Sequence, residues 1–200
     1  MKFLGNRNIK RMIAVFLLTV TAVSSGLFLT RCASEADKAE VLAAFKELYE
    51  KSIEINDYIF GEGLPVTESF DSDDVKSPYY VAVSENAEYR TREELEAAVL
   101  DVYSSEYYES ALKAALFEGY EDGSGPDPRY ITDGSVFKID AGNKGADTSG
   151  RFDPETAEIV DISASSASVR ATYTRAGTVA EYTLSMVRTE NGWRFNVPTY

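Results

Sequence analysis

The last quarter of the chain carries the strongest constraint on the fold, an alternation of apolar and polar residues. Residues 167–175 and 179–188 alternate with a period of two, and 193–197 follows the same pattern. Gly177 and Asn191-Gly192 separate these segments and favour turns. The shared apolar face contains Val169, Ala171, Tyr173, Tyr182, Leu184, Met186, Trp193, Phe195 and Val197. The pattern predicts an antiparallel meander with one apolar face, preceded by a strand over 159–163.

A helical pattern over 36–60 provides an element to cover that face. Val41, Phe45, Leu48, Ile55 and Ile59 recur at three-, four- or seven-residue spacing, and Gly61 and Gly63 follow the last turn. A helix this apolar on one side needs a surface to bury it, and a sheet is the natural cover. We therefore predict an α+β fold, with a long N-terminal helix and shorter helices packed on a curved antiparallel sheet.

The middle of the chain predicts short elements joined by polar loops. Thr91 and Glu94 form a capping box, in which the Thr91 hydroxyl accepts the Glu94 amide and Glu94 bonds back to the Thr91 amide. Asp133-Gly134 is a strong hairpin signal. The expected elements are a strand over 79–83, a helix from Thr91 to a break at Ser104-Ser105, a helix over 106–117, a hairpin over 130–139, and loops over 61–78, 119–128 and 140–154.

An uncharged apolar run, Met12–Thr30, precedes this domain. Lys2, Arg7, Lys10 and Arg11 lie before it. As a helix it would be about 28 Å long, close to the hydrocarbon thickness of a bilayer. Basic residues on its N-terminal side are typical of a secretion signal or a signal-anchor, and they place residues 33–200 outside the cytoplasm.

Leu29-Thr30-Arg31-Cys32 resembles a bacterial lipobox, with Arg31 where that pattern has a small residue. Three alternatives remain: a cleaved lipoprotein signal with a lipid on Cys32, an uncleaved single-pass anchor, or an ordinary cleaved signal. We favour a lipid-anchored protein on the outer face of the bacterial cytoplasmic membrane. The predicted organisation is a signal or anchor over 1–31, a short tether over 32–35 and one extracytoplasmic α+β domain over 36–200.

The exported part is strongly acidic. All 33 acidic residues follow Arg31, and five of the 20 basic residues lie at or before it, which leaves a net charge of −18. Such a surface repels nucleic acid, which binds through Lys and Arg. The expected partners are the membrane, through Cys32 or the helix 12–30, and an envelope protein with a basic surface.

The absence of histidine excludes several kinds of active site. The chain has no histidine and only one cysteine, Cys32. Ser-His-Asp and Cys-His nucleophile arrangements and histidine zinc sites are therefore excluded. Asp71, Asp73 and Asp74 do not fit a calcium-binding loop, because no glycine and glutamate follow at the required spacing. We predict no metal, no cofactor and no catalytic residue.

The order of elements, ending in Asn191-Gly192-Trp193-Arg194-Phe195, resembles the NTF2-like (cystatin-like cone) superfold. That resemblance implies a cavity between sheet and long helix, where enzymes of the group place a carboxylate. No Asp or Glu falls on the predicted inward face, and Tyr173, Tyr182 and Trp193 are the candidate pocket residues. Without such a carboxylate, the chain is expected to be a non-catalytic binding or interaction domain. The alternative is an enzyme or a small-ligand binder that uses the same pocket.

A second resemblance concerns Tyr89-Arg90-Thr91, Glu94-Leu95, Val102-Tyr103-Ser104 and the closing Gly-Trp-Arg strand. These segments are similar to the inhibitor family of DL-endopeptidases in Gram-positive cell envelopes. This implies an inhibitor of NlpC/P60-type peptidoglycan peptidases. The three hypotheses make different predictions: a buried carboxylate beside Tyr173 or Tyr182 for an enzyme, a filled pocket with an acidic protruding loop over 61–78 or 119–128 for an inhibitor, and an open pocket with few polar groups for a ligand binder.

Overall fold

The structure is a computed structural model that describes residues 34–67, 76–120, 123, 125–143 and 145–200. The predictions for the segment 1–31 and for Cys32 concern residues outside these ranges, and so do those for Asp71, Asp73 and Asp74. None of the helices in the described ranges combines the length and apolar character that crossing a membrane requires.

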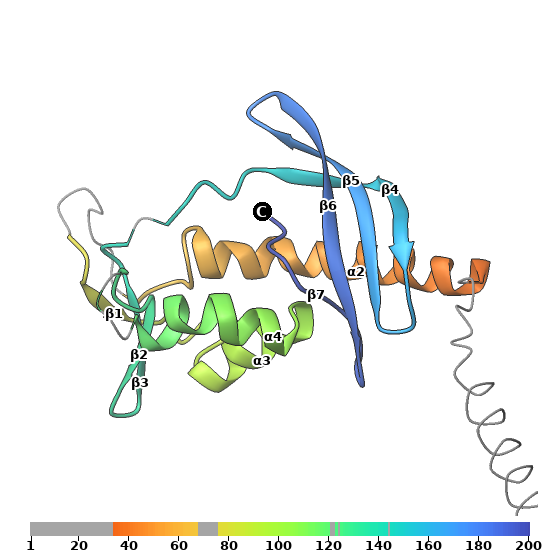
Figure 1. Ribbon diagram of the computed structural model, residues 1–200. Helices are drawn as coiled ribbons and strands as arrows, with labels where there is room; N and C mark the ends of the chain where they lie inside the picture. The colour runs from red at the N-terminus through yellow and green to blue at the C-terminus, as the bar shows by residue number, and fades with distance from the viewer. Residues whose placement is uncertain (1–33, 68–75, 121–122, 124, 144) are drawn as a thin grey trace, which may run out of the picture. The chain divides into compact units, whose positions relative to one another are not determined.

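The long helix α2 (Glu35–Phe60) is the central element of the fold (Figure 1). Its buried face includes Val41, Phe45 and Ile55, as the spacing predicts. The side chain of Arg129 caps the end of this helix, donating to the Tyr58 carbonyl at 3.2 Å and also to the Gly61 carbonyl. These bonds satisfy carbonyls that have no partner within a helix.

A four-stranded antiparallel sheet, in the order β4-β5-β6-β7, lies across α2 (Figure 1). Its strands are β4 (Arg151–Ile162), β5 (Ser166–Arg175), β6 (Thr178–Thr189) and β7 (Gly192–Phe195). The predicted meander is therefore confirmed. Phe45 of α2 meets Phe195 of β7 edge to face, with 5.6 Å between ring centroids, at the centre of the core. The molecule is an α+β protein with a helix packed on an antiparallel sheet.

A smaller unit of structure covers the end of α2. Strands β1 (Tyr80–Ala82), β2 (Tyr130–Asp133) and β3 (Val136–Asp140) form an antiparallel sheet in the order β1-β3-β2. Helix α3 (Arg92–Val102) packs on α2, and a single turn α4 (Ser105–Tyr107) leads into the π-helical segments η1 (Tyr108–Leu112) and η2 (Ala114–Glu118). The predicted short strand, the hairpin and both helices are thus present, but the sequence did not predict the π-helical winding.

Strand β4 corrects the largest error of the sequence analysis, a loop predicted over 140–154. The strand begins at Arg151, and Phe152 pairs with Tyr173 of β5. Asp153 and Pro154 favour a loop in isolation, but β4 is an edge strand and its register shifts after Asp153. An edge strand with a bulge tolerates proline, because the missing amide donor is not required there.

Smaller corrections concern the turns and the helix cap. The β2–β3 turn is Gly134-Ser135, because Asp133 pairs with Val136. That turn lies one residue later than predicted, whereas the β6–β7 turn lies one residue earlier, because Thr189 pairs with Gly192. In the capping box the Thr91 hydroxyl accepts the Glu94 amide at 3.2 Å, as predicted. The Glu94 carboxylate instead accepts the amide of Arg90 at 2.7 Å, one residue before the cap.

Candidate functional site

Two of the three predicted pocket residues lie together. Tyr173 of β5 pairs with Ala180 of β6, and Tyr182 of β6 pairs with Ala171, so the two tyrosines are diagonal neighbours on one face of the sheet. Their ring centroids are 5.5 Å apart and the rings are perpendicular. This edge-to-face pair forms the floor of a pocket.

Trp193, the third predicted residue, lies elsewhere. Its side chain is buried, and its indole N–H donates to Glu40 of α2 at 3.2 Å. The Arg188 guanidinium covers the ring at 5.5 Å from its centroid and forms an ion pair with the same Glu40. Trp193 therefore joins the sheet to the long helix and does not line the tyrosine pocket.

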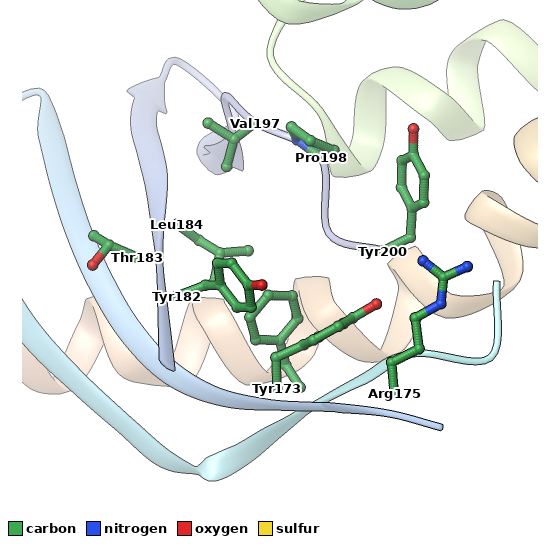
Figure 2. Close-up of a pocket in the computed structure, with 9 residues that line it drawn as sticks. Tyr173, Arg175, Tyr182, Thr183, Leu184, Val197, Pro198 and Tyr200 are labelled. Atoms are coloured by element: carbon green, nitrogen blue, oxygen red, sulfur yellow. The ribbon is translucent and has the colours of Figure 1, made fainter. Parts of the chain in front are cut away.

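The pocket lies between the β5–β6 face and the segment that follows β7 (Figure 2). Its volume is about 390 Å³, within the size range of small-molecule sites. It is open to solvent, and 53% of Tyr182 is exposed. The lining residues are Phe152, Tyr173, Arg175, Tyr182, Thr183, Leu184, Val197, Pro198 and Tyr200.

Neighbouring groups fix the aromatic floor. The Phe152 ring lies 4.8 Å from Tyr173 between centroids, and the Phe152 amide donates to the Tyr49 hydroxyl at 2.6 Å. The backbone of Gly150 closely approaches Tyr173, because a Cβ there would lie 1.7 Å from the Tyr173 hydroxyl oxygen. A side chain at Gly150 would therefore displace the Tyr173 ring.

The opposite wall is held by a closed ring of hydrogen bonds. The Tyr103 hydroxyl donates to Asn56 Oδ1 at 2.5 Å, and Asn56 Nδ2 donates to Thr199 Oγ1 at 2.9 Å. The remaining 2.8 Å contact, between Thr199 Oγ1 and the Tyr103 hydroxyl, is completed when Thr199 donates. All three side chains are buried. The ring holds Thr199 between Pro198 and Tyr200, which both line the pocket.

Tyr200 is fixed from a second direction. Its ring stacks on Phe60, the last residue of α2, with 4.0 Å between centroids. Two backbone bonds anchor the preceding residues, from Asn196 to the Ser185 carbonyl at 2.9 Å and from Ser104 to the Phe195 carbonyl at 2.8 Å. The residues that form this wall of the pocket are therefore held in place by contacts with the rest of the fold.

Arg175 is the one residue with a charged side chain among those that line the pocket, and no Asp or Glu does so. Its Nε contacts Asp147 Oδ2 at 3.2 Å. Hydrogen bonds from the Ser149 hydroxyl and amide, followed by Arg175, lower the pKa of Asp147 to about 2. Asp147 is therefore ionised at neutral pH and available to pair with Arg175.

The polar groups of the pocket are otherwise hydroxyls. Tyr173, Tyr182 and Tyr200 carry phenol groups for which the described part of the chain provides no hydrogen-bond partner. The carboxylate that an enzyme would place beside Tyr173 or Tyr182 is not among the lining residues. No group of three potential metal-ligating side chains occurs among the described residues. The arrangement is suited to stacking on a flat ligand and bonding to its polar edge.

Seven of the nine lining residues were not among the predicted pocket residues, although Leu184 and Val197 belong to the predicted apolar face. Arg175 follows Tyr173 by two positions on the same strand, so its place on the pocket face was available from the alternation. Phe152 was hidden by the loop predicted over 140–154. Val197, Pro198 and Tyr200 lie in or beyond the last predicted apolar segment, where no pattern indicates which way the chain turns.

Compared with known protein families and with curated proteins, this chain matches none of them.

Proposed function

We propose that this chain is an extracytoplasmic, membrane-tethered binding domain without catalytic activity, and that the aromatic pocket is its ligand site. The observation that carries the proposal is the pocket lining, which combines four aromatic side chains with no acidic side chain. An open aromatic pocket with few polar groups is what a small-ligand binder requires. A carboxylate-dependent enzyme would need an acid or base within hydrogen-bond reach of its substrate.

We further propose an NTF2-like arrangement, supported by a long helix beneath a four-stranded antiparallel meander. The space between helix and sheet is occupied by buried side chains, among them Phe45, Leu184 and Phe195. The open pocket lies instead beside the segment after β7. Within this fold class, ligand binding would therefore use the space between the β5–β6 face and the segment that follows β7.

A titration tests the ligand site directly. The full chain would be placed in phosphatidylcholine nanodiscs and titrated by calorimetry with 2-naphthamide, a flat neutral probe, against empty nanodiscs. We expect saturable binding that weakens about tenfold in Tyr182→Ala, because base or ring stacking on one aromatic contributes about 1–3 kcal/mol. Val179→Ala is the matched control, since Val179 lies on the same strand, is 64% exposed and does not line the pocket. Equal loss in both variants, or no binding to the wild type, would refute the proposal.

The membrane tether is tested by the intact mass of the membrane-extracted protein, with Cys32→Ala alongside. We expect loss of residues 1–31 and a diacylglycerol adduct on Cys32. A full-length mass that changes in the variant only by the substitution would instead identify 12–30 as a permanent anchor helix.

The second candidate is an inhibitor of a peptidoglycan DL-endopeptidase. The filled helix–sheet interior favours it, since an inhibitor needs no internal cavity. Residues 68–75 and 121–122, which belong to the acidic loops expected to contact the peptidase, lie outside the described residues. The test is hydrolysis of peptidoglycan fragments by an NlpC/P60-type peptidase with and without the full chain. Undiminished hydrolysis at a tenfold excess of the chain would exclude this function.

A further inference from the structure

We propose that the ligand of the aromatic pocket is a small acid, with a flat apolar body and one carboxylate that the Arg175 guanidinium binds. The inference rests on the proposed function of the pocket and adds the charge of its ligand.

The pocket differs in charge from two neighbouring surface depressions. The chain carries a net charge of −13, and both depressions beside α2 are lined by carboxylates. One is lined by Glu40, Glu47 and Asp101 together with Lys51 and Arg194, and the other by Glu54, Glu88 and Asp101 together with Lys51, so acidic side chains outnumber basic ones in both. Arg175 is the only charged side chain that lines the aromatic pocket, and its partner Asp147 is not among the lining residues. A further depression is lined by Arg92 without an acidic side chain, but Arg92 pairs with both Glu96 and Glu118. In a chain with 33 acidic and 20 basic residues, this lining is suited to a negatively charged ligand.

The ion pair between Arg175 and Asp147 leaves the guanidinium edge with the two terminal nitrogens available to a carboxylate. Its contact with Asp147 involves Nε, at 3.2 Å, and both side chains are about half exposed. The two terminal nitrogens have no partner among the described residues. Figure 2 shows the end of the guanidinium directed toward Tyr200, on the pocket side of the strand. Two parallel N–H groups of an arginine match the two oxygens of a carboxylate.

The rest of the pocket determines the shape of the acid. The perpendicular pair of Tyr173 and Tyr182 offers a ring face and a ring edge, which favours a flat apolar body. Their hydroxyls can donate to a ligand oxygen. Aromatic rings also attract cations, but the Asp147 carboxylate is already paired with Arg175, and no Asp or Glu side chain lines the pocket to bind a cationic ligand. An acid with a planar body satisfies both the rings and the charge.

A pair of isosteric probes separates this inference from the proposed function. The full chain in phosphatidylcholine nanodiscs would be titrated by calorimetry with 2-naphthoate and with 2-naphthamide, which differ in charge and share the aromatic body. We expect the wild type to bind naphthoate about tenfold more tightly, because an ionic hydrogen bond is stronger than a neutral one but is screened at a half-exposed site. Arg175→Gln should abolish this preference, and Arg175→Lys should retain part of it.

Two further variants sharpen the result. Arg170→Gln is the matched control, because Arg170 lies on the same strand, is similarly exposed and pairs with Glu158 and Glu181 outside the pocket. It should leave the preference unchanged. Asp147→Asn should raise the naphthoate affinity two- to threefold, because it removes the carboxylate that competes for Arg175. Circular dichroism would establish that each variant is folded.

The outcomes are distinguishable. Equal affinities for the two probes, or a preference that survives Arg175→Gln, would overturn the acid inference and leave the pocket as a ligand site. The absence of saturable binding for both probes would overturn the pocket as a ligand site and the acid inference with it.

Discussion

Two groups of tyrosines in this molecule have different roles, although the side chain is the same. Tyr103 is fully buried, and its hydroxyl is a member of the closed ring with Asn56 and Thr199. Tyr173 and Tyr182 lie on the sheet face, with hydroxyls that have no partner among the described residues. A buried phenol must be paired because an unsatisfied one costs about 1–3 kcal/mol, whereas an exposed phenol remains available to a ligand. The comparison separates residues that maintain the fold from residues that present a surface.

The largest expected effect is the loss of the Tyr103 side chain. Tyr103→Ala removes a buried ring and leaves Asn56 and Thr199 without their partner, so we expect a loss of about 3–5 kcal/mol in the free energy of unfolding. Tyr182→Ala, at a site that is 53% exposed, should cost less than about 1 kcal/mol. Urea denaturation of the two variants measures both values. Similar losses would mean that the two groups do not differ in their structural role.

Breaking the ring while preserving its shape should have an intermediate effect. Thr199→Val removes a hydroxyl that accepts from Asn56 and donates to Tyr103, and we expect a loss of about 1–2 kcal/mol. The variant should also weaken 2-naphthamide binding, because Pro198 and Tyr200 on either side form the pocket wall. Thr199→Ser keeps the hydroxyl and should retain both properties. Unchanged binding in a destabilised Thr199→Val protein would show that the wall does not depend on the ring.

Alkaline pH should destabilise the fold through its buried tyrosines. Burial raises the pKa of Tyr103 far above 10, and burial followed by the nearby Tyr200 raises the pKa of Tyr107 to about 12. The folded state therefore keeps protons that the unfolded state loses, so their contribution is complete below pH 10 and is lost as the pH rises toward 12. At pH 10.5 we expect Tyr103 to account for about 1 kcal/mol of lost stability.

The measurement combines tyrosinate absorbance at 295 nm with circular dichroism as the pH is raised. A fraction of the tyrosines should ionise only when the secondary structure is lost. Complete ionisation of all 13 tyrosines before any change in circular dichroism would contradict the expectation.

The smallest expected effect concerns the packing beneath Tyr173. Gly150→Ala places a methyl group where the Tyr173 hydroxyl now lies, so the ring must rotate, and we expect 2-naphthamide binding to weaken about threefold. The same change in a Tyr173→Ala background should have no further effect, because the displaced ring is absent. Additive losses in the double variant would indicate that Gly150 acts on the pocket by another route.

The sequence predicted the parts of the fold that are governed by periodicity. The stripe that contains Val41 and Phe45 defined α2, and the alternation through Val169 and Leu184 defined the meander. The rest of the fold depends on which residues pair between strands. The sequence did not predict the start of β4 around Phe152, because Asp153 and Pro154 are turn formers. Pairing of Phe152 and Asp153 with β5 makes this part of the chain extended, and Pro154 falls in the register shift that follows. Local preference and tertiary pairing disagree there, and tertiary pairing determines the structure.

The candidate site was predictable only in part for the same reason. Tyr173 and Tyr182 were identified because they continue an apolar face, but so does Trp193, which instead covers the long helix and bonds to Glu40. The alternation specifies a face of the sheet and not a position along it. Which part of the face α2 covers depends on the packing of the helix, and which segment closes the pocket depends on the path after β7 (Figure 1).

The ring of Tyr103, Asn56 and Thr199 also has a consequence for folding kinetics. Its three contacts join residues that are 47, 96 and 143 positions apart in the chain. Contacts of such long range form after the helices and the meander have come together, because closing long loops is entropically unfavourable until other contacts compensate. We therefore expect the ring to form after the transition state for folding. Its loss should accelerate unfolding and leave the refolding rate nearly unchanged.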